Sequence, residues 1–292
     1  VKPDDMIFAS TFEAKSKLNK SESFLKIIND ESNMFSEAFN EKFYVIRKWI
    51  EDKLELIKPT TRYRSNKTND THLKKITSII KEFDTGISDI YLSDVSLEEV
   101  KKILPDELLE DIIDDADKKA EKGDSRNSFT LNFSPYYYII DIENGEIKSI
   151  KELKFNHHGK GCEFRYFEES DGTKRLFDIL DILLSAEGKV FIVDELERSL
   201  HPRLTKRFIE LFLEKNKGKE SQLIFTTHET YIMSLELFRQ DEVWFVEKND
   251  DGYSSLYSLN EYKERYDKKI DKAYLEGRYG AVPVFKGLGV GV

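Results

Sequence analysis

The chain has 292 residues, which suits one large domain or two smaller ones, and its formal net charge of −10 argues against non-specific coating of nucleic acid. Hydrophobic residues make up 39% of the chain and aromatic residues 12%, which is enough for a packed core and excludes wholesale disorder. No apolar run approaches the roughly 18 residues of a membrane helix, and the single cysteine, Cys162, excludes a disulfide framework, so we expect a cytoplasmic protein without a membrane segment.

The first third of the chain has the pattern of helices. Apolar residues recur at steps of three and four along one expected helix: Phe35, Phe39, Phe43, Ile46, Ile50, Leu54 and Ile57. Pro59 ends this helix, and a second helix is predicted from residue 72 to about residue 83, with Gly86 as its C-cap. The charged segment 114–128 is interpreted as a solvated loop or helix end. We expect residues 1–128 to form a mostly helical lobe.

From Phe129 onward, short strand patterns alternate with helical ones. The aromatic and β-branched segment 136–142, the turn residues 143–145 and the segment 146–155 predict an antiparallel hairpin. Further strands are expected at residues 162–167, 189–193, 222–227, 242–246 and 254–259. Helices are expected to begin near Ser170, at Pro202 and after His228. This alternation predicts an α/β fold for residues 129–292, with a mainly parallel sheet and antiparallel additions.

The strongest chemical signal is the apolar strand 189–193, which runs directly into Asp194 and Glu195. Carboxylates at the carboxyl end of a buried parallel strand lie where α/β sheets bind ligands. Asp194 can hold Mg²⁺ directly or through water, and Glu195 can orient or deprotonate an attacking water. For a strand followed by Asp-Glu in isolation, an acidic turn is the simpler interpretation.

Three further features favour the functional interpretation. The strand that ends at His228 places its imidazole at the same sheet edge, where it can donate to a γ-phosphate, although a lone histidine is more often structural. The second feature is the expected helix N-terminus formed by Ser170, Asp171, Gly172 and Thr173. A helix N-terminus is a natural phosphate site, although these residues also suit an ordinary capped helix start. The third is the turn with Ser199 and His201, which can reach across an interface or simply begin a helix at Pro202.

In this order, the motifs resemble those of ABC-type ATPases. Residues 170–173 resemble the signature motif, residues 190–195 the Walker B motif with its catalytic glutamate, residues 199–202 the D-loop, and His228 the switch histidine. The chain is most similar to the SMC-like AAA-family ATPases of prokaryotic anti-phage and abortive-infection loci. The segment 274–283 (YLEGRYGAVP) also resembles that branch.

The resemblance implies a P-loop NTPase core in which ATP and Mg²⁺ are the cofactors and the helical first half is an insertion. It implies that Asp194 holds Mg²⁺ and that Glu195 and His228 are catalytic. Contacts to the nucleotide are implied for Ser170, Asp171, Gly172, Thr173, Ser199 and His201. It further implies a homodimer with two composite nucleotide sites, acting as a nucleotide-controlled switch in antiviral defence.

One motif that a working family member needs does not occur in these residues. A phosphate-cradling loop ends in Gly-Lys followed by Ser or Thr, and the Gly-Lys pairs that begin at Gly159, Gly188 and Gly218 do not continue in this way. No glutamine precedes the signature motif either. We expect the Walker A and Q-loop segments upstream of Val1 or on a separate segment; the alternative is a degenerate, non-hydrolysing homologue.

Two other functions compete with a stand-alone ATPase. One is a nucleotide-binding scaffold that sequesters and releases a toxic effector protein with little hydrolysis, which turnover measured with and without the effector would separate. The other is a nuclease of the ATPase-plus-Toprim type, for which the segment after His228 is too short to add a further acidic domain. Contact of the basic residues within 42–67 with nucleic acid is left open, since acidic residues interleave with them.

Overall fold

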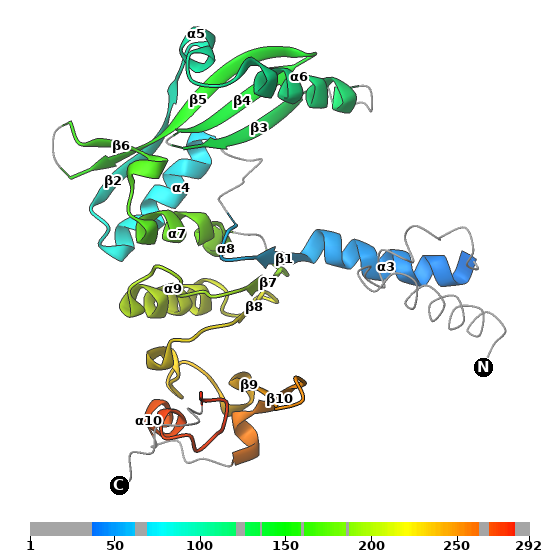
Figure 1. Cartoon of the computed structure of the whole chain (residues 1–292), viewed down its shortest axis with the longest axis vertical. Coiled ribbons are helices and arrows are strands. Elements are labelled where there is room, and N and C mark those ends of the chain that lie inside the picture. Colours follow the sequence, from blue (N-terminus) through cyan, green and yellow to red (C-terminus); the bar gives the residue numbers. More distant parts are fainter. Residues whose placement is uncertain are drawn as a thin grey trace.

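The computed structural model describes residues 37–61, 69–120, 126–134, 136–158, 161–184, 187–262 and 269–283. Figure 1 shows a large twisted antiparallel sheet at one end, a small parallel sheet with helices in the middle, and a C-terminal hairpin and helix at the other end. The expected α/β class is confirmed, with the antiparallel additions forming the largest sheet. Among the described residues, no helix has the length and apolar character needed to cross a membrane.

Three four-residue strands form the parallel sheet in the order β1-β7-β8: β1 (Leu54–Ile57), β7 (Val190–Val193) and β8 (Gln222–Phe225). Phe191 and Val193 of β7 are buried, and they point to the face covered by α7 (Asp171–Ile179) and α9 (Pro202–Lys215). The predictions of strands at β7 and β8, and of a helix beginning at Pro202, are confirmed.

The predicted long first helix is wrong at its C-terminal end. Helix α3 (Glu37–Lys53) ends before Leu54, and the next four residues form β1, which pairs in parallel with β7. Leu54 and Ile57 are three residues apart, so they fit a helical stripe as well as a strand, and tertiary pairing decides between the two. The first member of the predicted stripe, Phe35, lies outside the described residues.

The larger sheet has the order β2-β5-β4-β3, with β6 beside β5. Its strands are β2 (Ile87–Asp94), β3 (Arg126–Phe133), β4 (Tyr136–Glu143), β5 (Glu146–His157) and β6 (Glu163–Arg165). The hairpin between β4 and β5 is confirmed, and its turn residues Asn144 and Gly145 both have positive φ, at 52° and 75°. Such a turn matches the twist of the strands it joins.

Four helical segments cover the two sheets or lie at their ends: α4 (Asp70–Ile80), α5 (Leu97–Lys101), α6 (Asp106–Ala120) and α8 (Asp181–Leu184). Helix α4, with the short η2 (Lys81–Phe83), confirms the second predicted helix, although the residue that ends it in the left-handed conformation is Asp84, two residues before Gly86. The charged segment 114–128, expected to be a solvated loop or helix end, contains the end of α6 and the start of β3.

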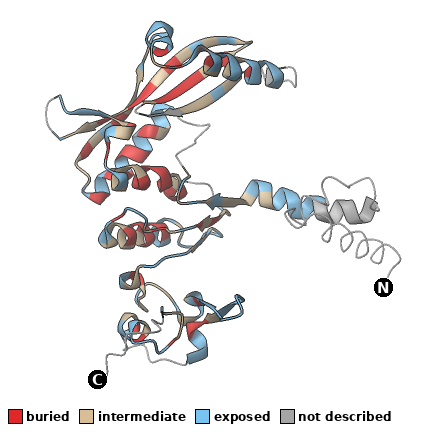
Figure 2. Ribbon diagram, viewed as in Figure 1, coloured by how far each residue is buried: buried red, intermediate tan, exposed pale blue. Residues whose placement is uncertain are grey.

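One buried core contains residues from both sides of the proposed division at residue 128. Leu73 and Ile76 of α4 belong to the same buried cluster as Leu176 and Phe177 of α7. Figure 2 shows this buried interior running through α4, α7 and α9 and into the centre of the antiparallel sheet, while the described part of α3 is mostly exposed. Strands and helices from both sides of residue 128 contribute to the same sheets and to the same core. The division of the chain at this residue remains a proposal drawn from the sequence.

The helix predicted after His228 is wrong. The segment forms the short η4 (Thr230–Ile232) and η5 (Gln240–Glu242), joined by turns. The hydroxyl oxygens of Thr227 and Ser234 each accept a hydrogen bond from the backbone N–H two residues later, which favours turns over a helix.

The late hairpin is confirmed and belongs to a separate small core. The hairpin consists of β9 (Trp244–Lys248) and β10 (Ser254–Ser258). The core also includes residues of η6 (Leu259–Tyr262) and α10 (Ile270–Leu275). The buried residues of this core are Phe245, Leu259, Ile270, Ala273 and Tyr279.

The shared core gives a stability prediction. Leu176→Ala removes a fully buried side chain from α7 and should lower the free energy of unfolding by about 2–5 kcal/mol. The control is Leu213→Ala on α9, which removes a side chain that is 46% exposed and should change stability by less than about 0.5 kcal/mol. Urea unfolding followed by fluorescence measures both. Equal losses would show that α7 does not pack as described.

Candidate functional site

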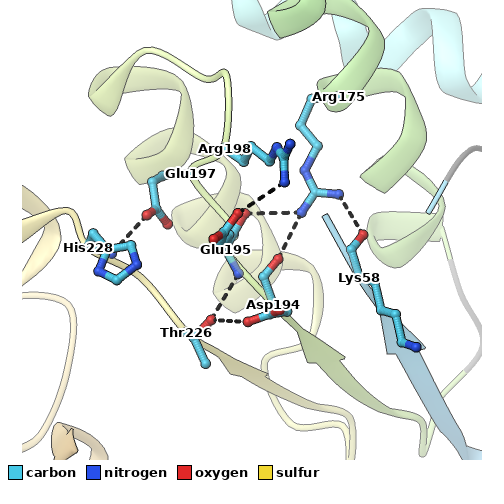
Figure 3. A network of polar contacts seen from close by, with 8 residues as sticks. All are labelled: Lys58, Arg175, Asp194, Glu195, Glu197, Arg198, Thr226 and His228. Atoms are coloured by element: carbon cyan, nitrogen blue, oxygen red, sulfur yellow. Dashed lines mark hydrogen bonds and ion pairs between the residues drawn. The ribbon is translucent and has the colours of Figure 1, made fainter. Parts of the chain in front are cut away.

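The carboxyl ends of β7 and β8 are joined by one hydroxyl group. Thr226 follows β8, and its Oγ1 donates a hydrogen bond to Asp194 Oδ1 at 2.7 Å. The same oxygen accepts a hydrogen bond from the backbone N–H of Glu195 at 2.9 Å. The backbone N–H of Leu196 donates to the Thr226 carbonyl at 3.1 Å. Thr226 thus fixes the turn that carries both acidic residues (Figure 3).

Glu195 has an unusual backbone conformation. Its φ is 48°, in the left-handed region, which costs a residue with a Cβ roughly 1–2 kcal/mol. Such conformations persist where the surroundings hold them in place. Its carboxylate accepts a hydrogen bond from Arg198 Nη1 at 3.3 Å, as a partly exposed ion pair. The turn therefore presents this carboxylate at the surface from a fixed backbone.

His228 lies at the same edge as the acidic pair. Its backbone N–H donates to Glu197 Oε1 at 2.8 Å. This hydrogen bond joins the turns after β7 and β8 in addition to the bonds made by Thr226. The residue is exposed. Asp194, Glu195 and His228 thus lie just after the carboxyl ends of the neighbouring strands β7 and β8 (Figure 3).

The helix N-terminus predicted from the sequence is also present. Ser170 is the N-cap of α7, and its Oγ accepts a hydrogen bond from the backbone N–H of Thr173 at 3.1 Å and shares another with the Thr173 hydroxyl at 2.9 Å. Asp171 forms an ion pair with Lys174 at 2.9 Å. These contacts are sufficient to explain the residue types as a capped helix start, so a role toward phosphate stays a proposal.

Gly172 brings the first turn of α7 against the turn after β7. A Cβ at this position would lie 2.8 Å from the backbone carbonyl oxygen of Ser199, which is closer than real Cβ atoms approach. Ser199 itself has a φ of 62°. The signature candidate and the D-loop candidate of one chain are therefore in direct contact, and this contact requires a glycine.

His201 is a helix cap in this structure. Its Nδ1 accepts a hydrogen bond from the backbone N–H of Arg203 at 3.2 Å, at the start of α9. Because Nδ1 is the acceptor, a neutral ring carries its proton on Nε2. Both Ser199 and His201 are exposed, which an interface role requires but does not establish.

Three residues of the site were not singled out from the sequence: Arg175, Glu197 and Thr226. Arg175 is only 3% exposed, and its guanidinium donates to the carbonyl oxygens of Lys58, Asp194 and Glu195 at 3.4, 3.3 and 3.2 Å. The sequence signal for Arg175 is its position directly before the apolar residues Leu176 and Phe177. Such a position indicates a buried guanidinium, which needs hydrogen-bond acceptors.

The donor set at this edge fits a magnesium ion shared with a nucleotide. Within the part of the chain that the structure describes, no group of three or more histidine, cysteine, aspartate or glutamate side chains could hold a metal ion by itself. Mg²⁺ is usually held by one or two carboxylates together with the phosphates of its substrate, so it does not need such a group. The Asp194 carboxylate, oriented by Thr226, supplies an oxygen ligand of the right kind.

The Thr226 contacts give a prediction that needs no ligand. Thr226→Val keeps the side-chain volume but removes the acceptor of the Glu195 N–H, so backbone hydrogen exchange in residues 194–196 should become about tenfold faster, the effect of losing roughly 1.4 kcal/mol of hydrogen bonding. Thr226→Ser, which keeps the hydroxyl, is the control. Exchange at the wild-type rate in the valine variant would show that the hydroxyl does not hold the turn.

Comparisons with known proteins give one family match and two weak structural similarities. The profile of a protein family described as "AAA domain, putative AbiEii toxin, Type IV TA system" matches residues 9–234. A structure from work on ATP-driven dimerization and DNA-stimulated activation of SMC ATPases is 18% identical with a TM-score of 0.31, covering 59% of this chain and 96% of that one. The Smc head domain with a coiled coil and joint from Pyrococcus yayanosii is 19% identical with a TM-score of 0.34, covering 92% of this chain and 42% of that one.

These two structural similarities are too weak to carry an argument, and no curated protein is significantly similar to the chain. The family profile is different, because it spans most of the sequence and includes both Asp194 and His228. The chain therefore belongs to this family of AAA domains.

Proposed function

We propose that this protein binds ATP with Mg²⁺ and hydrolyses it to ADP and phosphate at the edge where Asp194, Glu195 and His228 lie. The observation that carries the proposal is the Thr226 hydroxyl, which donates to Asp194 Oδ1 and accepts the backbone N–H of Glu195, so that both acidic residues are held at the end of β7. Family membership supports nucleotide-dependent chemistry at these motifs. The proposal requires a phosphate-binding loop that ends in Gly-Lys followed by Ser or Thr, and none of the Gly-Lys pairs in these 292 residues continues in this way.

Asp194 is the proposed ligand of Mg²⁺. When bound, the metal neutralises charge on the phosphates of the nucleotide. The Thr226 hydroxyl donates to one carboxylate oxygen of Asp194 and thereby sets the plane of the carboxylate. A carboxylate offers about four lone-pair sites on its two oxygens, so this hydrogen bond leaves sites for a metal or for metal-bound water.

Glu195 is proposed to orient the attacking water and accept its proton. Its ion pair with Arg198 is partly exposed, and such pairs contribute only about 0–1 kcal/mol. A water molecule can therefore replace or share the Arg198 contact at small cost. The left-handed backbone and the N–H bond to Thr226 keep Glu195 at the sheet edge while this exchange takes place.

His228 is proposed to donate a hydrogen bond to the transferred phosphoryl group. Its backbone is fixed by Glu197, and the residue is exposed at the same edge. A hydrogen-bond donor at the position where negative charge develops stabilises the transition state.

A homodimer with composite sites is part of the proposal. The exposed start of α7, at Ser170 and Asp171, would contact the nucleotide of a second copy, together with Gly172 and Thr173. Ser199 and His201 would lie at the same interface, because Ser199 is in contact with Gly172. A nucleotide bound between two copies would then control their association.

We further propose that this switch acts in prokaryotic antiviral defence. The family description, which names an AbiEii toxin and a type IV TA system, supports this setting. A scaffold that holds a toxic effector with little turnover differs from the proposed ATPase in one measurable way, namely that ATP hydrolysis stays negligible with and without the effector.

Replacing the proposed base tests the assignment of chemistry. Glu195→Gln keeps the shape of the side chain but cannot accept the proton, so ATP hydrolysis should fall by roughly 10²–10⁴-fold. ATP-dependent dimers, measured by light scattering, should persist. Glu220→Gln, at an exposed position beyond α9, is the control and should hydrolyse ATP at the wild-type rate. Wild-type turnover in the Glu195 variant would refute its assigned role.

The histidine can be tested with little disturbance of the fold. Glu197 accepts its hydrogen bond from the backbone N–H of residue 228, so His228→Ala removes only the imidazole and leaves this contact in place. The kcat for ATP should fall by roughly 10²–10³-fold, as when a single donor to developing charge is removed. The thermal midpoint should change little. A kcat within twofold of wild type would contradict the proposed role.

A further inference from the structure

The buried arginine of α7 is unusual for its place in the fold. Arg175 is 3% exposed and is followed directly by the core residues Leu176 and Phe177. Burying a charged guanidinium is costly unless hydrogen bonds satisfy it. Its acceptors show what the contacts do.

Three backbone carbonyl oxygens that directly follow strands accept hydrogen bonds from Arg175. One belongs to Lys58, directly after β1, at 3.4 Å. The other two belong to Asp194 and Glu195, directly after β7, at 3.3 and 3.2 Å, and both accept from the same nitrogen, Nη2. The planar guanidinium can reach separate acceptors in a fixed geometry, whereas a lysine ammonium is a single point of charge.

These contacts enclose the backbone of Glu195. The carbonyl of Asp194 is in the peptide unit before the Glu195 Cα, and the carbonyl of Glu195 is in the unit after it, so Arg175 holds both units. Thr226 accepts the N–H of the first unit. The two peptide planes determine where the Cα–Cβ bond points, and here they hold the left-handed conformation with a φ of 48°.

We infer that Arg175 is a positioning residue that holds the Glu195 backbone in this conformation and so aims its carboxylate; the inference rests on the proposed function for its catalytic consequence. Figure 3 shows the guanidinium reaching from α7 to the turn that bears Glu195 and to Lys58. The same helix begins at Ser170 and touches Ser199 through Gly172. Helix α7 therefore carries at its start the surface proposed to contact the nucleotide of a second copy, and through Arg175 it also contacts the backbone of the proposed base, Glu195.

Two variants of the full chain test this inference. Arg175→Lys keeps the positive charge but not the planar fork, and Arg175→Met keeps much of the length without charge. In both, backbone hydrogen exchange in residues 194–196 should be at least fivefold faster. The kcat for ATP should fall at least tenfold, while KM changes by less than threefold, because the described contacts of Arg175 are with backbone carbonyl oxygens that position Glu195. If the methionine variant does not fold, the lysine variant decides.

A matched control removes an arginine that pairs with side chains instead. Arg207→Met, on α9, breaks ion pairs with Glu82, Glu210 and Glu214 and should leave both kcat and the exchange of residues 194–196 unchanged. Wild-type kcat and wild-type exchange in Arg175→Lys would overturn the inference. So would a loss of kcat with unchanged local exchange, since the arginine would then act without moving Glu195.

The Glu195→Gln variant, measured in parallel, separates this inference from the proposed function. If that variant hydrolyses ATP at the wild-type rate, the proposed function fails, and the exchange rates of the Arg175 variants alone decide whether Arg175 holds the turn. Faster exchange then supports the positioning of the backbone, and unchanged exchange overturns it.

Discussion

The parallel pairing of β7 with β8 is the constraint on which the whole site depends. The register places Val193 opposite Phe225, so the next residues, Asp194 and Thr226, leave the sheet side by side and their side chains can bond. A shift of one residue in this register would turn Thr226 toward the other face of the sheet. The hydroxyl would then be lost to both Asp194 and Glu195, although every strand would still be present.

The sheet that carries this register is held mainly from one face. Phe191 and Val193 are buried in the core to which α7 and α9 contribute. On the opposite face, the register aligns Leu56, Ile192 and Ile224, and within the described ranges Leu56 is 57% and Ile224 54% exposed. The turns after β1 and β7 are therefore fixed from the α7 side, which is also the side from which Arg175 reaches them.

The elements predicted correctly are those with local signals, and the errors arise where distant contacts decide. An apolar run before Asp194 and a turn at Asn144 and Gly145 were enough for β7 and the β4–β5 hairpin. Strand β2 was missed, because its pairing with β5 shifts register between Ile87 and Asp89 and so breaks the two-residue alternation. At the site, acidic and imidazole side chains follow strands visibly in the sequence. The role of Arg175 is not visible there, because it depends on the direction of backbone carbonyl groups.

The charges of the acidic turn support different roles for its members. Three carboxylates lie within four residues, at Asp194, Glu195 and Glu197, and each has its own donor. Asp194 is bonded to a hydroxyl and Glu197 to a backbone N–H, which are neutral groups, whereas Glu195 is paired with the Arg198 cation. Asp194 therefore has no described side-chain cation in direct contact with its carboxylate, and this suits a ligand of Mg²⁺. Glu195 already has a cation beside it and competes less for the metal, which suits a group that handles water.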